Sequence, residues 1–349
     1  MAVGLEGNAA GVALKSGINL YDRVLSSRMR LAAPLAGYPG VRLIGRSVRD
    51  ALSHPGVQLE ALKALEERLK PDIVFTLMDV TVEADALGLG VRFFEKKPPS
   101  LAAKLLFDLD GFSDLDVPDP ERSGRMPVFL RVAEALSENE DRMCGAFVTG
   151  PLTLLSQLLG MNEVLACLRS GEPLQDPLVF ALEVVGEYAA SLASRADLVV
   201  VVEPAAGSLQ PWEYRHFCRP YIGGLAGIIR SAGAECLLHI CGNVSRLLGE
   251  IALSGVGGVI LSRQVDLPRE AEKLPSNLLL LGNIDPTMVL QHGTVEEVRR
   301  EVRRLLRHME GTRNFILSTG CDVPVDVPVR NLEAMMSEVC GWRPRSILI

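Results

Sequence analysis

The chain has 349 residues, a formal net charge of −7 and only 5% aromatic residues, a balance that argues against nucleic acid as a partner because nucleic acid binds to basic surfaces. Its seven cysteines are odd in number, irregularly spaced and without a CxxC pair, which excludes the disulfide framework of a small secreted domain. The length suits one barrel-like domain over residues 1–349, since α/β barrels routinely use about 200–250 residues or more.

The first 70 residues contain several prolines and glycines, which indicates an arm or cap that precedes the first strand. Residues 1–20 have no basic start and no sustained apolar core, so they do not form a signal peptide. No later apolar run approaches the roughly 20 residues that span a bilayer. We therefore expect a reduced, cytoplasmic protein that makes no contact with a membrane.

Seven short apolar runs follow along the chain, each bounded by glycine, proline or charged residues. They comprise residues 73–78, 145–150, 198–204, 236–242, 257–262, 278–284 and 315–320. Because apolar and polar side chains do not alternate within them, these runs are typical of strands that are buried on both faces in a parallel sheet.

Helical patterns lie between the runs, most clearly in residues 58–69, 177–195 and 294–310. The last of these begins with a capping box at Thr294. Alternating strands and helices indicate right-handed crossovers. We predict a (β/α)8 TIM barrel, possibly distorted, whose eighth strand has no clear place in the sequence. An open doubly wound sheet is the alternative, although neither G-x-G-x-x-G nor Walker A occurs.

A long acidic loop covers residues 109–127 and shows no strong periodicity. Long loops in compact domains often serve as lids over a site. In a barrel, the site lies at the carboxyl ends of the strands. Several chemically active side chains follow the predicted strands directly: Asp79, Glu203, His239, Cys241, Asn283, Asp285 and Cys321. We expect these residues to meet at one edge of the sheet.

His239, Cys241 and Cys321 form a soft set of one nitrogen and two sulfur ligands. His239 and Cys241 are two residues apart, so in a strand their side chains point to the same face. Zinc accepts such ligands, and three protein ligands leave a fourth position open for catalysis. The alternative is that the cysteines are small buried core residues and the histidine is a satisfied core residue.

Asp79 and Glu203 are candidate catalytic residues. Asp79 could act as a general base or as a hydrogen-bonding anchor, or it could cap the helix that follows. Glu203 could support the metal ligands or cap a helix. Asn283 and Asp285 could contact a ligand or shape a turn. The sequence alone leaves these alternatives open.

The stretches "HICG", "GNIDP" and "ILSTGCDVPVDVPVRNLEAM" make residues 28–340 resemble the uroporphyrinogen decarboxylase superfamily. Within it, the chain is similar to the branch of methylcobamide:thiol methyltransferases, such as the methylcobamide:coenzyme M enzymes. The zinc motif of that branch, His-x-Cys followed by a distant Cys, falls on His239, Cys241 and Cys321. The resemblance implies a (β/α)8 barrel and a zinc site.

The sequence departs from the pattern of true decarboxylases in three places. Their arginine-rich R-Q-A-G-R-Y stretch corresponds to "SSRMRLAAPLAGYPG" in residues 26–40. Their active-site tyrosine falls near Gln157, and their late histidine falls at about Thr319. The aspartate that they keep is present as Asp79. We take Gln157, with Asn283 and Asp285, as a candidate for substrate binding.

The resemblance implies a zinc-dependent enzyme that moves a methyl group from a methylated corrinoid to a small thiol, such as coenzyme M or homocysteine. The chain contains no D-x-H-x-x-G, the sequence associated with corrinoid carriers, so the corrinoid co-substrate should be held by a separate carrier protein. The alternatives are a uroporphyrinogen decarboxylase or related tetrapyrrole enzyme, and a non-catalytic corrinoid-binding barrel.

Overall fold

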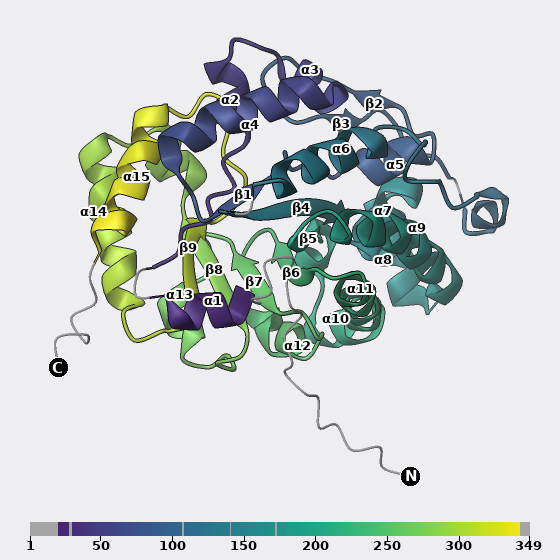
Figure 1. Cartoon of the computed structure of the whole chain (residues 1–349). Coiled ribbons are helices and arrows are strands. Elements are labelled where there is room, and N and C mark those ends of the chain that lie inside the picture. The colour runs from purple at the N-terminus through teal and green to yellow at the C-terminus, as the bar shows by residue number, and fades with distance from the viewer. Residues whose placement is uncertain (1–19, 28–29, 107, 140, 172, 343–349) are drawn as a thin grey trace.

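A computed structural model describes residues 20–27, 30–106, 108–139, 141–171 and 173–342 of the chain. Its centre is a curled sheet of seven parallel strands in the order β1-β4-β5-β6-β7-β8-β9 (Figure 1). The strands are β1 (Ile73–Phe75), β4 (Met143–Thr149), β5 (Leu198–Val202), β6 (Glu235–Ile240), β7 (Gly258–Leu261), β8 (Leu279–Ile284) and β9 (Phe315–Thr319). All seven predicted strands are therefore confirmed, and every neighbouring pair is parallel.

The strands are buried on both faces, which explains their continuous apolar runs. One set of side chains fills the inside of the curled sheet, including Phe75, Phe147, Val200 and Ile316. The other set packs outward against the surrounding helices.

The eighth position of the ring is filled without a regular strand. Residues 31–35 lie between β9 and β1, where Ala32 pairs in parallel with Leu317 and its carbonyl accepts a hydrogen bond from the Asp72 amide at 3.0 Å. Pro34 has no amide hydrogen to donate, which limits the ladder that this segment can form. Among the described residues the main sheet has seven strands, so the predicted eight-stranded barrel is not confirmed. Part of the predicted cap, residues 31–35, belongs to the ring instead.

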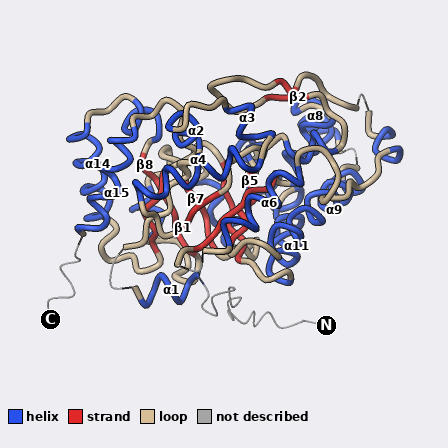
Figure 2. The backbone as a smooth tube through the Cα atoms, turned by 45° about the horizontal axis from the view of Figure 1, so that its top comes forward, coloured by secondary structure: helices blue, strands red, loops and turns tan. Residues whose placement is uncertain are grey.

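Helices surround the strands on the outside of the ring (Figure 2). The longer ones are α4 (Pro55–Leu69), α6 (Met126–Ser137), α8 (Met161–Ser170), α9 (Gln175–Ala193), α11 (Arg219–Ser231), α14 (Val295–His308) and α15 (Val329–Gly341). The shorter ones are α1 (Leu20–Ser26), α2 (Tyr38–Leu43), α3 (Val48–Ser53), α5 (Val82–Ala86), α7 (Pro151–Leu159), α10 (Pro211–Phe217), α12 (Leu248–Ala252) and α13 (Leu267–Ala271). The three helices expected from the sequence are confirmed, and Thr294 forms the predicted capping box with Glu297.

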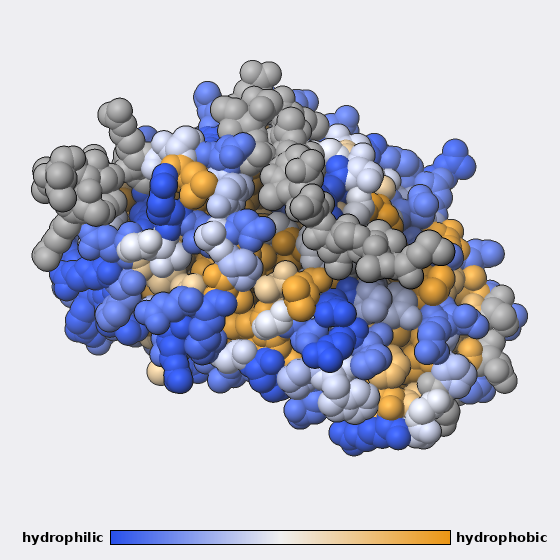
Figure 3. All heavy atoms as spheres, turned by 90° about the horizontal axis from the view of Figure 1, so that it is seen from below, coloured by the Kyte–Doolittle hydropathy of each residue, from blue (hydrophilic) through white to orange (hydrophobic). Residues whose placement is uncertain are grey.

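Short elements occupy the connections. They are the strands β2 (Val91–Arg92) and β3 (Ser100–Leu101), the 3-10 turns η1 (Asp110–Asp114), η2 (Pro204–Ser208) and η3 (Ser245–Leu247), and the π-helical turn η4 (Pro286–Gln291). The predicted acidic loop contains η1 and ends as α6 begins. Seen from the side of α1 and α12, the surface shows apolar residues set among hydrophilic ones (Figure 3).

No single described helix is long and apolar enough to cross a membrane. By length and composition alone, the bent pair α7 and α8 would pass the same test. Many residues of both helices are buried against the rest of the chain.

Candidate metal centre at the carboxyl edge of the sheet

His239 lies near the end of β6 and is fully buried. Its Nδ1 is 3.0 Å from the carbonyl oxygen of Ile260 on the neighbouring strand β7. A carbonyl only accepts hydrogen bonds, so Nδ1 donates to Ile260, and this contact directs Nε2 toward the sulfur atoms. Nε2 is 3.4 Å from the Sγ atom of Cys241, which is the first residue beyond β6.

Cys321 brings the second sulfur to the same point. It follows β9, and its Sγ atom is 3.9 Å from that of Cys241. The three ligand atoms all lie within 4.8 Å of one another. A tetrahedral zinc ion with Zn–S of about 2.3 Å and Zn–N of about 2.05 Å requires S–S and S–N separations of about 3.8 Å and about 3.6 Å. The residues present therefore fit a zinc ion.

The curl of the sheet brings the two cysteines together although 80 residues separate them in the chain. β6 and β9 are three places apart in the strand order, so a flat sheet would hold their ends apart. Gly320 lets the β9 end approach the loop after β7 closely, since a Cβ atom there would lie 2.6 Å from the Arg263 amide nitrogen. Close packing of the loops thus sets the position of Cys321.

The charges of the two thiols are coupled. A hydrogen bond from Cys241, supported by His239, lowers the pKa of Cys321 below its ordinary value. The same hydrogen bond and burial raise the pKa of Cys241 well above its ordinary value. The chain by itself thus favours one thiolate and disfavours the second. A divalent cation between the sulfurs would remove the repulsion between two thiolates.

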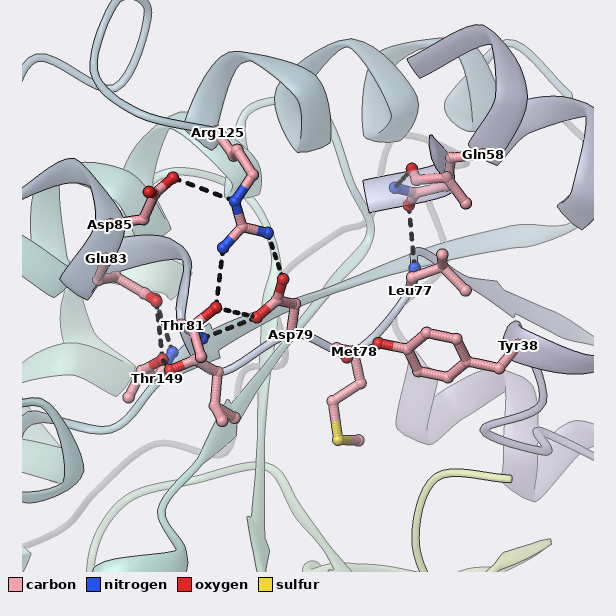
Figure 4. A network of polar contacts seen from close by, with 12 residues as sticks. Tyr38, Gln58, Leu77, Met78, Asp79, Thr81, Glu83, Asp85, Arg125 and Thr149 are labelled. Atoms are coloured by element: carbon pink, nitrogen blue, oxygen red, sulfur yellow. Dashed lines mark hydrogen bonds and ion pairs between the residues drawn. The ribbon is translucent and has the colours of Figure 1, made fainter. Parts of the chain in front are cut away.

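Asp79 lies in a network of buried polar groups (Figure 4). Its carboxylate accepts hydrogen bonds from the Thr81 amide and hydroxyl, at 2.8 and 2.7 Å, and it forms an ion pair with Arg125. Arg125 also pairs with Asp85, Nε to Oδ2, at 3.1 Å. The Asp79 side chain has no exposed surface. In this arrangement Asp79 joins Thr81, at the start of α5, to Arg125, and its catalytic role stays a prediction.

Glu203 is fully buried beyond β5. Its carboxylate accepts hydrogen bonds from the Leu152 and Thr153 amides, at 3.0 and 2.7 Å, and from the Thr153 hydroxyl. These amides belong to the first turn of α7, where a negative charge is favoured by the helix dipole. Burial raises the pKa of Glu203 to about 7. The structure therefore places Glu203 as a cap on α7.

The three candidate substrate-binding residues contact backbone groups of nearby loops. The Gln157 amide donates to the Val80 carbonyl at 2.7 Å, while its own side-chain oxygen is buried without a partner among the described residues. The Asn283 amide donates to the carbonyls of Ser262 and Val265, at 3.1 and 2.8 Å.

Asp285 caps η4, where it accepts hydrogen bonds from the amides of Thr287 and Met288, and it pairs with Arg263 at 3.0 Å. Asn283 and Asp285 also line a surface groove beside α13 and α14, and none of the three metal ligands lines that groove. The structure thus brings His239, Cys241 and Cys321 together, and the role of Gln157, Asn283 and Asp285 in substrate binding stays a prediction.

Sequence reasoning missed Arg125 and Tyr38. Arg125 holds Asp79 from a position 46 residues along the chain, and the Tyr38 hydroxyl donates to the Met78 carbonyl at 2.7 Å (Figure 4). The only signal for Arg125 is a basic residue at the end of an acidic loop, immediately before a buried helix. Tyr38 lies in the segment that was predicted as a cap, where nothing marks it as part of the ring's edge.

Comparison with known proteins finds matches over most of the chain. The profile of the family described as uroporphyrinogen decarboxylase matches residues 21–342. A methylcobamide:CoM methyltransferase of Methanosarcina mazei is 28% identical over 276 residues, which cover 76% of this chain and 78% of that protein. A uroporphyrinogen decarboxylase of Prochlorococcus marinus is 25% identical over 308 residues, 85% of each chain.

The solved structures include a similar fold. A methyltransferase from Methanosarcina mazei superposes with a TM-score of 0.83 and 21% identity, over 95% of this chain and 98% of that one. At this identity the likeness concerns the fold alone.

Proposed function

The chain belongs to the uroporphyrinogen decarboxylase family, and we propose that within it this protein is a zinc-dependent enzyme that transfers a methyl group from a methylated corrinoid to a small thiol. One observation carries the proposal: a buried histidine and two cysteine sulfurs lie within 4.8 Å of one another, and the Cys241–Cys321 and Cys241–His239 separations of 3.9 and 3.4 Å are close to those of tetrahedral zinc. The similarity to methylcobamide:CoM methyltransferases supports it.

The histidine and the two cysteines have different roles at the site. His239 is oriented by its hydrogen bond to the Ile260 carbonyl, so its Nε2 faces the two sulfurs. Cys241 and Cys321 as thiolates offset the charge of a divalent cation. When bound here, zinc supplies the Lewis acidity that holds an acceptor thiol as its thiolate at neutral pH. Cys241 lies at the protein surface, and we propose that an acceptor thiol approaches the fourth ligand position from this side.

The methyl transfer is a nucleophilic displacement at the methyl carbon. The thiolate sulfur attacks the methyl carbon on Co(III), a C–S bond forms, and the Co–C bond breaks. The cobalt keeps the electron pair and becomes Co(I), and the thiol proton goes to solvent. Alignment of the sulfur with the methyl group lowers the barrier. We propose that a separate corrinoid carrier protein delivers the methyl group, and that the acceptor is a small thiol such as coenzyme M or homocysteine.

Asp79 has a positioning role in this proposal. It ties Arg125, at the end of the acidic loop, to the residues that follow β1. Asp79→Asn keeps an oxygen acceptor but removes the charge that pairs with Arg125. We expect a lower turnover with unchanged zinc content, and a loss of zinc from this variant would make Asp79 a metal ligand instead.

Metal analysis of the purified protein, followed by methylcobalamin demethylation with a panel of thiols, tests the proposal. We expect about one zinc per chain and a thiol-dependent change in the corrinoid absorption spectrum. Turnover of uroporphyrinogen without metal would select the decarboxylase alternative. Tight corrinoid binding with neither zinc nor turnover would select a non-catalytic binding protein.

A further inference from the structure

Arg246 binds three backbone carbonyls beside the candidate zinc ligands His239, Cys241 and Cys321. It lies in η3, just after β6, and each of its guanidinium nitrogens has a carbonyl partner. Nη2 donates to Gly207 at 2.6 Å, Nη1 to Asn243 at 3.0 Å and Nε to Leu209 at 3.1 Å. These carbonyls belong to two loops, one after β5 and one after β6. Arg246 therefore joins the two loops by charge-assisted hydrogen bonds.

Gly207, one of these partners, lies against the backbone of Cys241. A Cβ atom at Gly207 would be only 2.9 Å from the Cys241 carbonyl oxygen. Cys241 is the first residue beyond β6, and it is exposed. The loop after β5 therefore packs directly against the turn that contains Cys241. Contacts that hold residues 207–209 in place therefore also limit the positions open to the Cys241 backbone.

We infer that Arg246 is a positioning residue for the metal, which holds residues 207–209 against the turn 241–243 and so keeps the Cys241 sulfur within ligand distance of the other two. The inference rests on the zinc site of the proposed function. It also explains a difference between the ligands. His239 is held by its strand and by Ile260, whereas Cys241 lies beyond the strand and depends on packing between loops.

A second arginine binds several backbone carbonyls at the amino end of the ring, away from the candidate zinc ligands. Arg30 donates to the carbonyls of Met309 and Thr312, both at 2.5 Å, and of Glu310 at 2.9 Å, just beyond the carboxyl end of α14. Arg30 and Arg246 thus each join backbone carbonyls through one guanidinium. Only Arg246 does so beside a metal ligand, which makes Arg30 a matched control.

The experiment compares Arg246→Ala and Arg246→Lys with Arg30→Ala. Zinc affinity is measured by competition with a chromophoric chelator, and the geometry of the site by the absorption spectrum of the Co²⁺-substituted protein. We expect Arg246→Ala to weaken zinc binding about 10- to 100-fold, as for other groups that orient metal ligands, and to shift the cobalt bands. Lysine cannot span three carbonyls with a rigid fork, so Arg246→Lys should recover only part of the affinity.

Arg30→Ala should lower the melting temperature and leave the zinc affinity and cobalt spectrum unchanged. If it does not fold, Arg230→Ala replaces it, since Arg230 donates to the Gly255 carbonyl at the same end of the ring. Wild-type zinc affinity and spectrum in Arg246→Ala would overturn the inference, as would an equal loss of affinity in the control. A wild-type protein that binds zinc but does not demethylate methylcobalamin with any thiol would refute the proposed function and leave the inference standing.

Discussion

Both ends of the ring bury polar groups that bind nearby backbone, but the carboxyl end also holds side chains that converge on one point. At the amino end, Asp197 accepts a hydrogen bond from the Cys144 amide at 2.8 Å, and the Asn314 amide donates to the Leu278 carbonyl at 2.5 Å. At the carboxyl end, His239, Cys241 and Cys321 point at a common position. Side chains that bind nearby backbone stabilise the fold, whereas side chains that converge on one point can hold a ligand. Barrel enzymes show the same division between the two ends of their strands.

Removal of the converging sulfurs should have the largest effect and should spare the fold. In the Cys241→Ala, Cys321→Ala double variant only one of the three ligands remains, so we expect zinc to be lost and methyl transfer to fall by at least about 10³-fold. Cys340→Ala is the matched control, since Cys340 is an exposed cysteine on α15 outside the cluster. Full zinc content in the double variant would show that the metal binds elsewhere.

Glu83, a buried carboxyl group near the carboxyl edge of the sheet, should make the stability of the protein depend on pH. It is fully buried and accepts hydrogen bonds from the Thr149 amide and hydroxyl, at 2.6 and 2.7 Å. Burial raises its pKa from 4.5 to about 7. Between these values the folded protein holds a proton that the unfolded chain has released. Its contribution to stability is therefore present below about pH 4.5 and is lost as the pH rises to about 7.

Glu83→Gln should remove this pH dependence. One pKa unit corresponds to about 1.4 kcal/mol, and the pKa of Glu83 is raised by about 2.5 units. The wild type should therefore lose on the order of 3 kcal/mol of unfolding free energy over this pH range that the Glu83→Gln variant does not lose. The glutamine can fit, because the Thr149 hydroxyl also lies 3.1 Å from the Val80 carbonyl and can donate there. Urea titrations between pH 4.5 and 8 measure the slope. Glu203 titrates in the same range and stays in place, so part of the slope should remain.

A single polar group at the amino end should affect stability alone. Asp197→Ala leaves the buried Cys144 amide without its carboxylate partner, which should lower the free energy of unfolding by about 1–3 kcal/mol. The zinc affinity should not change, since Asp197 lies before β5 and the metal ligands lie at the opposite ends of the strands. Asp197→Asn, which keeps an oxygen acceptor, should lose less. A fall in zinc affinity in either variant would contradict the prediction that polar groups at the amino end affect stability alone.

The sequence predicts the parts of this arrangement that depend on local pattern. Continuous apolar runs predict the seven strands, and residues at strand ends predict the His239, Cys241 and Cys321 cluster, because parallel strands end at one edge. The partners of Asp79 and Glu203 could not be predicted in this way. Arg125 and Thr153 lie about 50 residues away from them in the chain, and only tertiary packing selects them.

The eighth position of the ring has a similar explanation. Residues 31–35 carry Pro34 and too few ladder hydrogen bonds to form a regular strand, so they have no strand pattern to detect. Their place between β9 and β1 depends on contacts with residues about 40 and about 285 positions away. Sequence pattern predicts elements well when their hydrogen bonds are regular, and poorly when distant residues supply them.

The exposed apolar residues give a last and smaller contrast between the two ends. Trp212 on α10 is 52% exposed and Met288 in η4 is 61% exposed. α10 follows β5 and η4 follows β8, so both lie at the carboxyl end and on either side of β6, which leads into Cys241. Leu253, after α12 and before β7, is 69% exposed at the amino end.

If a corrinoid carrier protein delivers the methyl group to the carboxyl edge, the Trp212 and Met288 side chains should become buried against it, and Leu253 should not. Replacing Trp212 and Met288 together by alanine should raise the KM for the methylated carrier about tenfold, a typical loss for a large apolar contact at an interface. Leu253→Ala should leave that KM unchanged. With free methylcobalamin as donor, all variants should match the wild type, because a small donor does not need the apolar contacts. An equal rise in KM for Leu253→Ala, or a loss of activity toward free methylcobalamin in the double variant, would show that these residues act through the fold rather than through contact with the carrier.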